Sequence, residues 1–356
     1  MARILYALNG QGRGHTSRAL GVAHTLRQRG HDVLFCCGAD AADRLRRQGE
    51  FVLDVPAPAE LVRGNRVRLL ATAWQNAPLA VRTPEIVEAL TERIDDLDPD
   101  LVVADFEPFA PRAARRLGLP VVALSHQQIL TETRCHVPLR YAASAALTRL
   151  GIGVMAPRGL FDRVVVPSFF FPPHRAGSDA ALVPPILRPD VLDAAPRRGA
   201  HLLVYVNHPE GSDRLLDVLR RVDAPFVVYN VPAPADSAAY PNLTFRAASR
   251  RGFVDDLAAC RAVVSTAGFT LLSEALHLGK PVLAAPNRGF FEQAVNALYL
   301  RRSGRGDAVL GRLTAPAIER FLRVLPPVAG GGPLGNALAA DHIEAVCPRR
   351  TFALAS

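Results

Sequence analysis

One stretch in the last third of the chain combines a small-residue turn, a predicted helix and a carboxylate one turn further on. The turn contains Ser265, Thr266 and Gly268, and the helix is predicted to begin at about Thr270. The first backbone N–H groups of a helix lack partners and carry partial positive charge, so they favour a phosphate group. Glu274 follows at a distance that suits the two hydroxyls of a ribose. The pattern predicts a site for a sugar nucleotide.

A second polar cluster follows the next turn. Glu292 and Asn296 are four residues apart, and Gln293 and Asn296 are three apart, so the three side chains share one face of a predicted helix. Carboxylate and amide groups on one face are suited to hydroxyls of the transferred sugar. Arg214 opens the predicted helix after the first strand of this half, where its guanidinium would pair with phosphates or remain solvated.

The first loop of the chain is rich in glycine and ends in a histidine. Gly12 and Gly14 precede His15 at a predicted helix start. The dinucleotide fingerprint requires its third glycine at the position of His15, so that fingerprint fails and an oxidoreductase is disfavoured. His15 lies at the carboxyl edge of the predicted sheet, where it would take a proton from an acceptor hydroxyl. Asp105 ends another strand at this edge and is predicted to orient the imidazole.

A second histidine stands at the same predicted edge. His126 follows the strand "VVALS" directly. It would line the acceptor pocket or serve as a loop histidine whose bonds are satisfied locally, and the sequence supports both interpretations.

The composition is that of a globular protein with a basic balance. The chain has 356 residues, 49% of them hydrophobic, a net charge of +9 and a single lysine, Lys280. This charge suits an anionic donor or an anionic membrane surface. Nucleic acid is not expected, because no basic run is interleaved with aromatic residues. Five cysteines without metal-ligand spacing, and the lack of a signal peptide or an apolar run of spanning length, predict a cytoplasmic protein.

Alternating strand and helix patterns predict an α/β protein with two Rossmann-like, doubly wound domains. The expected organisation is an acceptor-binding domain over 1–187, a linker over 188–200, a donor-binding domain over 201–332 and a C-terminal helix within 333–356 that packs back on the first domain.

Three apolar segments of the first domain have arginines nearby: Leu69–Trp74, Tyr141–Met155 and Phe169–Phe171. Core packing is the expected role of such segments. The alternative is peripheral contact with the inner face of a membrane that carries a lipid-linked acceptor. A small soluble metabolite as acceptor also fits the sequence.

The two motifs resemble those of GT-B glycosyltransferases. "GQGRGHTSR" is similar to the pattern GxGxGHxxR, and "AGFTLLSEALHLGKPVLAAPNRGFFEQAVNA" is similar to GGFTLxSEALxLGKPVLxxPxxxxxEQxxNA. The resemblance covers both halves of the chain and points to the group that includes the peptidoglycan N-acetylglucosaminyltransferase and the UDP-glycosyltransferases, especially its uncharacterised bacterial and archaeal members. It implies two domains facing across a cleft, an inverting reaction, no cofactor and no essential metal.

The resemblance also implies roles for single residues. Glu274 would bind the donor ribose, Glu292 and Gln293 the donor sugar, Arg214 a phosphate, and Val254 the base through its backbone.

The glycine loop with His15 would lie on the acceptor side. Phe269 stands near the place of a tryptophan found in plant-type donor motifs, and Thr266 replaces a phosphate-binding histidine.

The sequence therefore predicts an inverting glycosyltransferase that moves a sugar from a nucleoside-diphosphate sugar, most readily a UDP-sugar, to an acceptor hydroxyl. Two alternatives remain at this stage. One is a sugar-nucleotide 2-epimerase on the same fold, and the other is a donor-binding subunit that needs a catalytic partner.

Overall fold

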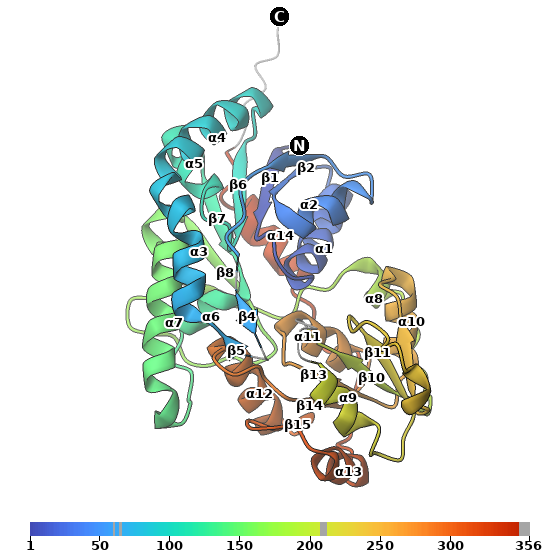
Figure 1. Cartoon of the computed structure of the whole chain (residues 1–356). Helices are drawn as coiled ribbons and strands as arrows, with labels where there is room; N and C mark the ends of the chain where they lie inside the picture. The colour runs from blue at the N-terminus through green and yellow to red at the C-terminus, as the bar shows by residue number, and fades with distance from the viewer. Residues whose placement is uncertain (60, 64–65, 207–211, 349–356) are drawn as a thin grey trace, which may run out of the picture.

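A computed structural model describes residues 1–59, 61–63, 66–206 and 212–348, and in these ranges the chain forms two parallel sheets flanked by helices (Figure 1). The sheet of the first domain has the strand order β3-β2-β1-β6-β7-β8-β9, and that of the second has the order β12-β11-β10-β13-β14-β15. A short antiparallel pair, β4-β5, lies outside both. This architecture confirms the prediction of two doubly wound domains.

The strands are short, and the central ones of each parallel sheet are almost wholly buried, whereas the edge strands β3 and β12 have exposed residues. In the first domain they are β1 Arg3–Leu8, β2 Asp32–Cys37, β3 Val52–Asp54, β4 Val62–Arg63, β5 Arg66–Val67, β6 Leu101–Asp105, β7 Val121–Leu124, β8 Arg163–Pro167 and β9 Ala181–Val183. In the second they are β10 Leu202–Tyr205, β11 Phe226–Tyr229, β12 Leu243–Arg246, β13 Ala262–Ser265, β14 Val282–Ala284 and β15 Gly306–Ala308.

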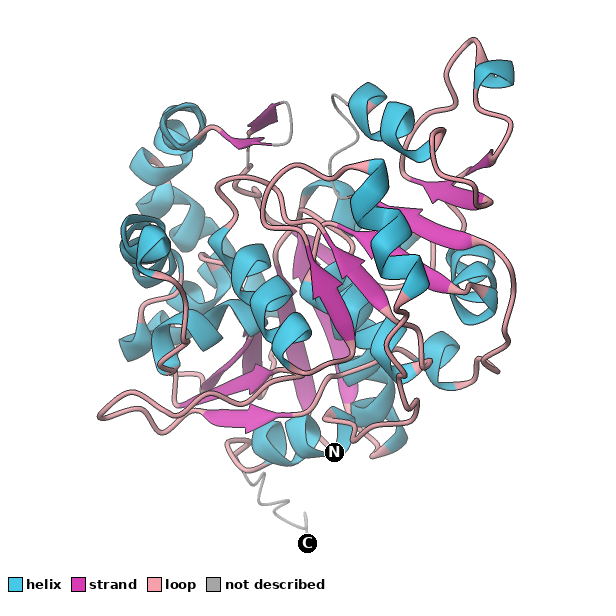
Figure 2. Cartoon of the chain, turned by 90° about the horizontal axis from the view of Figure 1, so that it is seen from below, coloured by secondary structure: helices cyan, strands magenta, loops and turns pink. Residues whose placement is uncertain are grey.

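Helices connect the strands and cover both faces of each sheet (Figure 2). They are α1 Gly14–Gln28, α2 Ala39–Arg46, α3 Leu69–Val81, α4 Thr83–Leu97, α5 Ala110–Arg116, α6 Ile129–Glu132, α7 Ala142–Met155, α8 Pro189–Leu192, α9 Asp213–Leu219, α10 Arg250–Ala259, α11 Phe269–His277, α12 Phe291–Arg302, α13 Ala315–Arg323 and α14 Asn336–Glu344.

The register of the first sheet brings the loop after β1 next to the end of β6. β1 pairs with β6 so that Leu8 lies opposite Asp105. Because parallel strands end at one edge, the loop after β1 and the end of β6 are adjacent. The same edge faces the second domain (Figure 1).

The end of the chain returns to the first domain. Ala339, Ala340 and Ile343 of α14 belong to the same buried cluster as residues of α1 and β1. Arg29, directly after α1, donates hydrogen bonds to Asp341 at 2.7 Å and Glu344 at 2.8 Å. The last residues of the predicted C-terminal segment, 349–356, lie outside the described residues. The predicted linker 188–200 contains α8.

One expectation about the core is wrong. The apolar segments Leu69–Trp74 and Tyr141–Met155 were expected to pack inside, but Trp74 and three large apolar residues of α7 are exposed. Segment Phe169–Phe171 is divided, with Phe169 buried and Phe171 exposed. Apolar composition marks both core helices and helices that face outward, so it does not distinguish them. In the part of the chain that the structure describes, no helix is both long and apolar enough to cross a bilayer.

Candidate active site between the domains

The predicted base and its partner are in contact. His15, in the first turn of α1, places Nδ1 2.8 Å from Oδ1 of Asp105 at the end of β6. Asp105 is fully buried, whereas the His15 side chain keeps a little exposure. Arg18 Nη2 also lies 3.1 Å from this Nδ1, so a donor and an acceptor both face it. The tautomer in which Nδ1–H donates to the ionised carboxylate leaves Nε2 as the basic nitrogen. Nε2 lies 3.4 Å from the amide nitrogen of Gln127.

Arg18 completes this cluster and was missed as a site residue. Its Nε and Nη2 donate to the two oxygens of Asp105 at 2.9 and 2.5 Å, and Tyr6 Oη donates to Oδ2 at 3.3 Å. Burial alone would raise the pKa of Asp105, but the charges of Arg18 and His15 and their hydrogen bonds hold it below its ordinary value. The sequence signal was available, because Arg18 is the last residue of the GxGxGHxxR pattern.

The phosphate-binding candidate lies directly across from this cluster. Gly268 caps α11, and Thr270 Oγ1 donates to the backbone oxygen of Gly14 at 3.3 Å. A Cβ atom on Gly14 would stand 2.8 Å from Thr270 Oγ1, so glycine is required for the approach. The first turn of α11 therefore meets the residue that precedes His15.

Backbone strain occurs next to Asp105 and next to the start of α11. Phe106, which follows Asp105, has φ +58°, and Ala267, which precedes Gly268, has φ +66°. Non-glycine residues adopt this region at a cost and cluster at functional sites. The strained positions flank the residues to which chemistry was assigned from sequence.

Glu274 is buried at the domain interface and already has partners. Its Oε1 accepts from Ser17 Oγ of α1 at 2.8 Å and from Arg188 Nε at 3.0 Å. Both partners, Ser17 and Arg188, lie outside the bounds 201–332 that were predicted for the second domain. A ribose would have to take the place of these donors.

His126 and Asn296 also meet across the interface. His126 is buried with Nδ1 2.8 Å from the Pro167 oxygen and Nε2 2.8 Å from Asn296 Oδ1, and its ring stacks on Phe269 at 3.8 Å. Burial lowers the pKa of His126 to about 4, so it is neutral near pH 7. A neutral imidazole carries one N–H, so it donates to only one of the two oxygens that face it. The buried, stacked ring favours a structural role at the interface over a place in an open acceptor pocket. Asn296 also donates to the Ala267 oxygen at 3.2 Å.

The remaining predicted donor residues occupy the carboxyl end of the second sheet and its helices. Ser265 and Thr266 are buried at the end of β13, and Val254 is buried in α10. Gln293 accepts from the backbone N–H of Asn287 at 2.9 Å. Glu292, at the start of α12, is half-buried.

Arg214 is exposed in α9, directly after residues outside the described ranges. Among the residues that the structure describes, no group of three or more His, Cys, Asp or Glu side chains is arranged to hold a metal.

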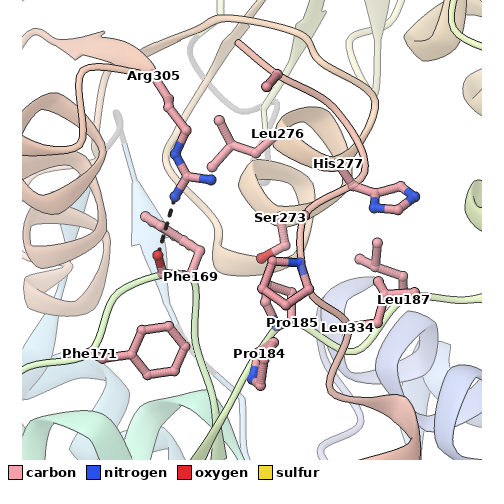
Figure 3. A pocket seen from close by; sticks show the side chains of 13 residues that line it. Phe169, Phe171, Pro184, Pro185, Leu187, Ser273, Leu276, His277, Arg305 and Leu334 are labelled. Atoms are coloured by element: carbon pink, nitrogen blue, oxygen red, sulfur yellow. Dashed lines mark hydrogen bonds between the residues drawn. The ribbon is translucent and has the colours of Figure 1, made fainter.

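A cavity of about 220 Å³ is lined by residues of α11 and of the first domain, and neither His15 nor Asp105 is among them (Figure 3). Phe169 and Phe171 line it from the first domain, and Leu276 and His277 line it from α11. Arg305 closes one side by donating to the Phe169 oxygen at 3.3 Å. The residues that line this cavity are not those predicted to bind the donor, so we do not place the reaction there.

Comparison with known proteins shows the family to which the chain belongs. Residues 2–326 match the model of glycosyl transferase family 1, and the chain belongs to this family. It is 23% identical over 341 residues to an uncharacterised glycosyltransferase of Methanosarcina acetivorans, covering 89% of this chain and 87% of the relative.

Solved structures show the same fold. The calicheamicin glycosyltransferase CalG4 matches with a TM-score of 0.64 and 22% identity over 99% of both chains. A UDP-glucosyltransferase from Polygonum tinctorium matches with a TM-score of 0.62 and 15% identity over 97% of this chain and 93% of the other. The protein is a glycosyltransferase with the GT-B fold, as its motifs suggested.

Proposed function

We propose that this glycosyltransferase moves a sugar, with inversion at the anomeric carbon, from a nucleoside-diphosphate sugar to a hydroxyl of a lipid or small metabolite. The observation that carries the proposal is the contact between Thr270 at the start of α11 and Gly14, next to His15. It sets a candidate phosphate site beside a candidate base. UDP is the favoured nucleotide, in line with the structural similarity to a UDP-glucosyltransferase.

His15 supplies the general base in this proposal. Its Nε2 removes the proton of the acceptor hydroxyl as the oxygen attacks the anomeric carbon, and the bond from that carbon to the diphosphate oxygen breaks on the opposite face. The new imidazolium donates from Nδ1 to Asp105, whose negative charge stabilises it. No cofactor takes part.

The leaving diphosphate is stabilised by the second domain. In this scheme the N–H groups of the first turn of α11 and the guanidinium of Arg214 would stabilise the developing charge, and a metal is not required. Glu292 and Gln293 would bind hydroxyls of the transferred sugar.

Glu274 would bind the ribose by an exchange of partners. Ser17 and Arg188 hold its carboxylate in the closed arrangement, and both donors come from outside the second domain. When the domains separate, two ribose hydroxyls would replace them as donors, and the interface closes again over the bound donor.

A calorimetric panel of UDP, dTDP, GDP, NAD and common sugar conjugates tests the proposal. Micromolar binding of one nucleoside diphosphate by the wild type, lost in Glu274→Ala, is the expected result. Binding of NAD alone would overturn it, as would sugar transfer by a His15→Ala variant at the wild-type rate.

A further inference from the structure

The cavity beside α11 lies where the chain passes from one domain to the other (Figure 3). Three of its residues belong to the segment that leaves the first domain after β9, and three belong to the segment that returns before α14: Pro184, Pro185, Leu187, Gly332, Pro333 and Leu334. Phe169 of the first domain and Leu276 of α11 complete these walls. The cavity is therefore bounded by both domains and by the segments that connect them.

Hydrogen bonds anchor the returning segment at its two ends. Gly331 N–H donates to the backbone oxygen of His277, the last residue of α11, at 2.8 Å. Gly335 N–H donates to the Pro185 oxygen of the first domain at 2.9 Å. A Cβ atom on Gly335 would collide with the Pro184 oxygen, so glycine is required for this approach. Residues 332–334 join the two anchors, and they must change conformation when one domain rotates against the other.

The size of the cavity follows the arrangement of the domains, because its walls belong to both. In the arrangement seen here the volume is about 220 Å³. Sites for drug-sized ligands have about 300–1,000 Å³, so this cavity suits a smaller molecule. A molecule that fits this arrangement and no other shifts the population of the protein towards it.

The walls combine apolar side chains with a guanidinium. Arg305, between α12 and β15, is half-buried at one side of the cavity (Figure 3). Its Nη2 donates to the Phe169 oxygen at 3.3 Å, and its Nε donates to Ser303 Oγ at 3.5 Å. Burial lowers the pKa of Arg305, and no carboxylate of the described ranges raises it. The guanidinium therefore meets the cavity without a negative partner from those ranges.

We propose that this cavity binds a small apolar molecule with one carboxylate, and that the bound molecule holds the two domains in the present arrangement. The hydrocarbon part contacts the phenylalanine, proline and leucine side chains, and the carboxylate pairs with the guanidinium of Arg305. His15 and Asp105 do not line the cavity, so binding there is separate from the proposed sugar transfer and is tested without it.

Octanoate and its neutral counterpart octanamide test the chemistry of the ligand. Calorimetry on the full-length protein should show that octanoate binds about tenfold more tightly, because only octanoate carries a charge for Arg305. Arg305→Gln should remove this difference. Arg301→Gln, at an exposed arginine near the end of α12, is the matched control and should keep it. Equal affinities for the two compounds in the wild type, or no binding of octanoate at millimolar concentration, would overturn the proposal.

A second pair of variants tests the place of binding. Ala329 is exposed and lines the cavity, so Ala329→Trp should fill the cavity and abolish octanoate binding. Ala337→Trp places the same side chain on an exposed position of α14 and should bind octanoate as the wild type does. Circular dichroism checks the fold of both. Unchanged octanoate binding by Ala329→Trp would assign the ligand to another place and overturn the proposal.

Hydrogen exchange tests the effect on the domains. With saturating octanoate, exchange in the peptides that cover 184–197 and 329–336 should slow about threefold in the wild type, because the connecting segments open less often. The Ala329→Trp variant should show no response to octanoate. Unchanged exchange in wild-type protein that binds octanoate would contradict the claim that the ligand holds the domains.

Discussion

Two buried ionic clusters lie within the candidate site, and they differ in how many parts of the chain build them. Asp105 is held by His15 and Arg18, which both belong to α1 of the same domain. Glu274 of the second domain is held by Ser17 of the first domain and by Arg188 of the linker. The first cluster can survive separation of the domains intact, whereas the second must break.

This difference matches the two roles proposed above for His15 and Glu274. A general base must have one orientation and one tautomer whenever the acceptor arrives, so its partners need to be fixed by one rigid element pair. A donor-binding carboxylate must exchange partners in every cycle, so partners on other segments are suited to it. In the proposed cycle the pair of Asp105 and Arg18 stays intact, whereas the pair of Glu274 and Arg188 exchanges partners, so the two clusters are here named permanent and exchangeable.

The largest expected effect is at the permanent cluster. His15→Ala should lower the turnover number by about 10²–10⁴ because it removes general-base catalysis. The affinity for the nucleoside diphosphate should stay unchanged, since the proposed donor-binding residues belong to the second domain. Initial rates and calorimetry measure the two quantities. Equal losses of both would show that His15 acts through the interface instead.

Arg18→Gln should also break the permanent cluster, with an effect on folding. Asp105 would stay buried with its main positive partner removed, which costs about 3–5 kcal/mol of unfolding free energy. Urea unfolding measures it. The control is Arg82→Gln, which removes an exposed pair with Glu85 and should cost less than about 1 kcal/mol. Similar values for the two variants would contradict a buried ionic role.

The dependence of folding stability on pH tests the role of His126 at the domain interface. The pKa of His126 is about 4 in the folded chain and about 6.5 when unfolded, so the unfolded chain binds more protons between these values. Stability should therefore fall as the pH drops from about 6.5 to 4, by about 3 kcal/mol from this group. In His126→Gln this part of the loss should vanish. Identical pH profiles for both proteins would exclude His126 as the cause.

The smallest expected effect is on nucleoside-diphosphate affinity at the cluster of Glu274 and Arg188. Substitutions of these two residues should change the affinity in opposite directions. Glu274→Gln should weaken nucleoside-diphosphate binding about tenfold, because a charged hydrogen-bond acceptor is lost. Arg188→Gln should tighten it about threefold, because a competing donor leaves the carboxylate. Calorimetry at constant pH compares the three proteins. A loss of affinity in both variants would make the cluster structural rather than exchangeable.

Much of the fold was predictable because its signals are local. Alternating strand and helix patterns predicted two doubly wound domains, and the structure has a parallel sheet in each. The sequence placed His15 and Asp105 at one sheet edge, because both follow strand ends, but their contact was only a hypothesis until the structure showed it. The apolar helices α3 and α7 were misassigned to the core, since their composition does not reveal what lies next to them.

The sequence by itself determined the two-domain parallel architecture, the GT-B motifs and the sheet edge that carries His15 and Asp105, because periodicity and turn chemistry act over a few residues. Only the tertiary structure decided that Arg18 completes the dyad, that Glu274 bonds Ser17 and Arg188, and that Asn296 meets His126. These contacts join residues from separate elements or from opposite domains. Their geometry depends on how whole helices and sheets pack, which no local pattern of residues specifies.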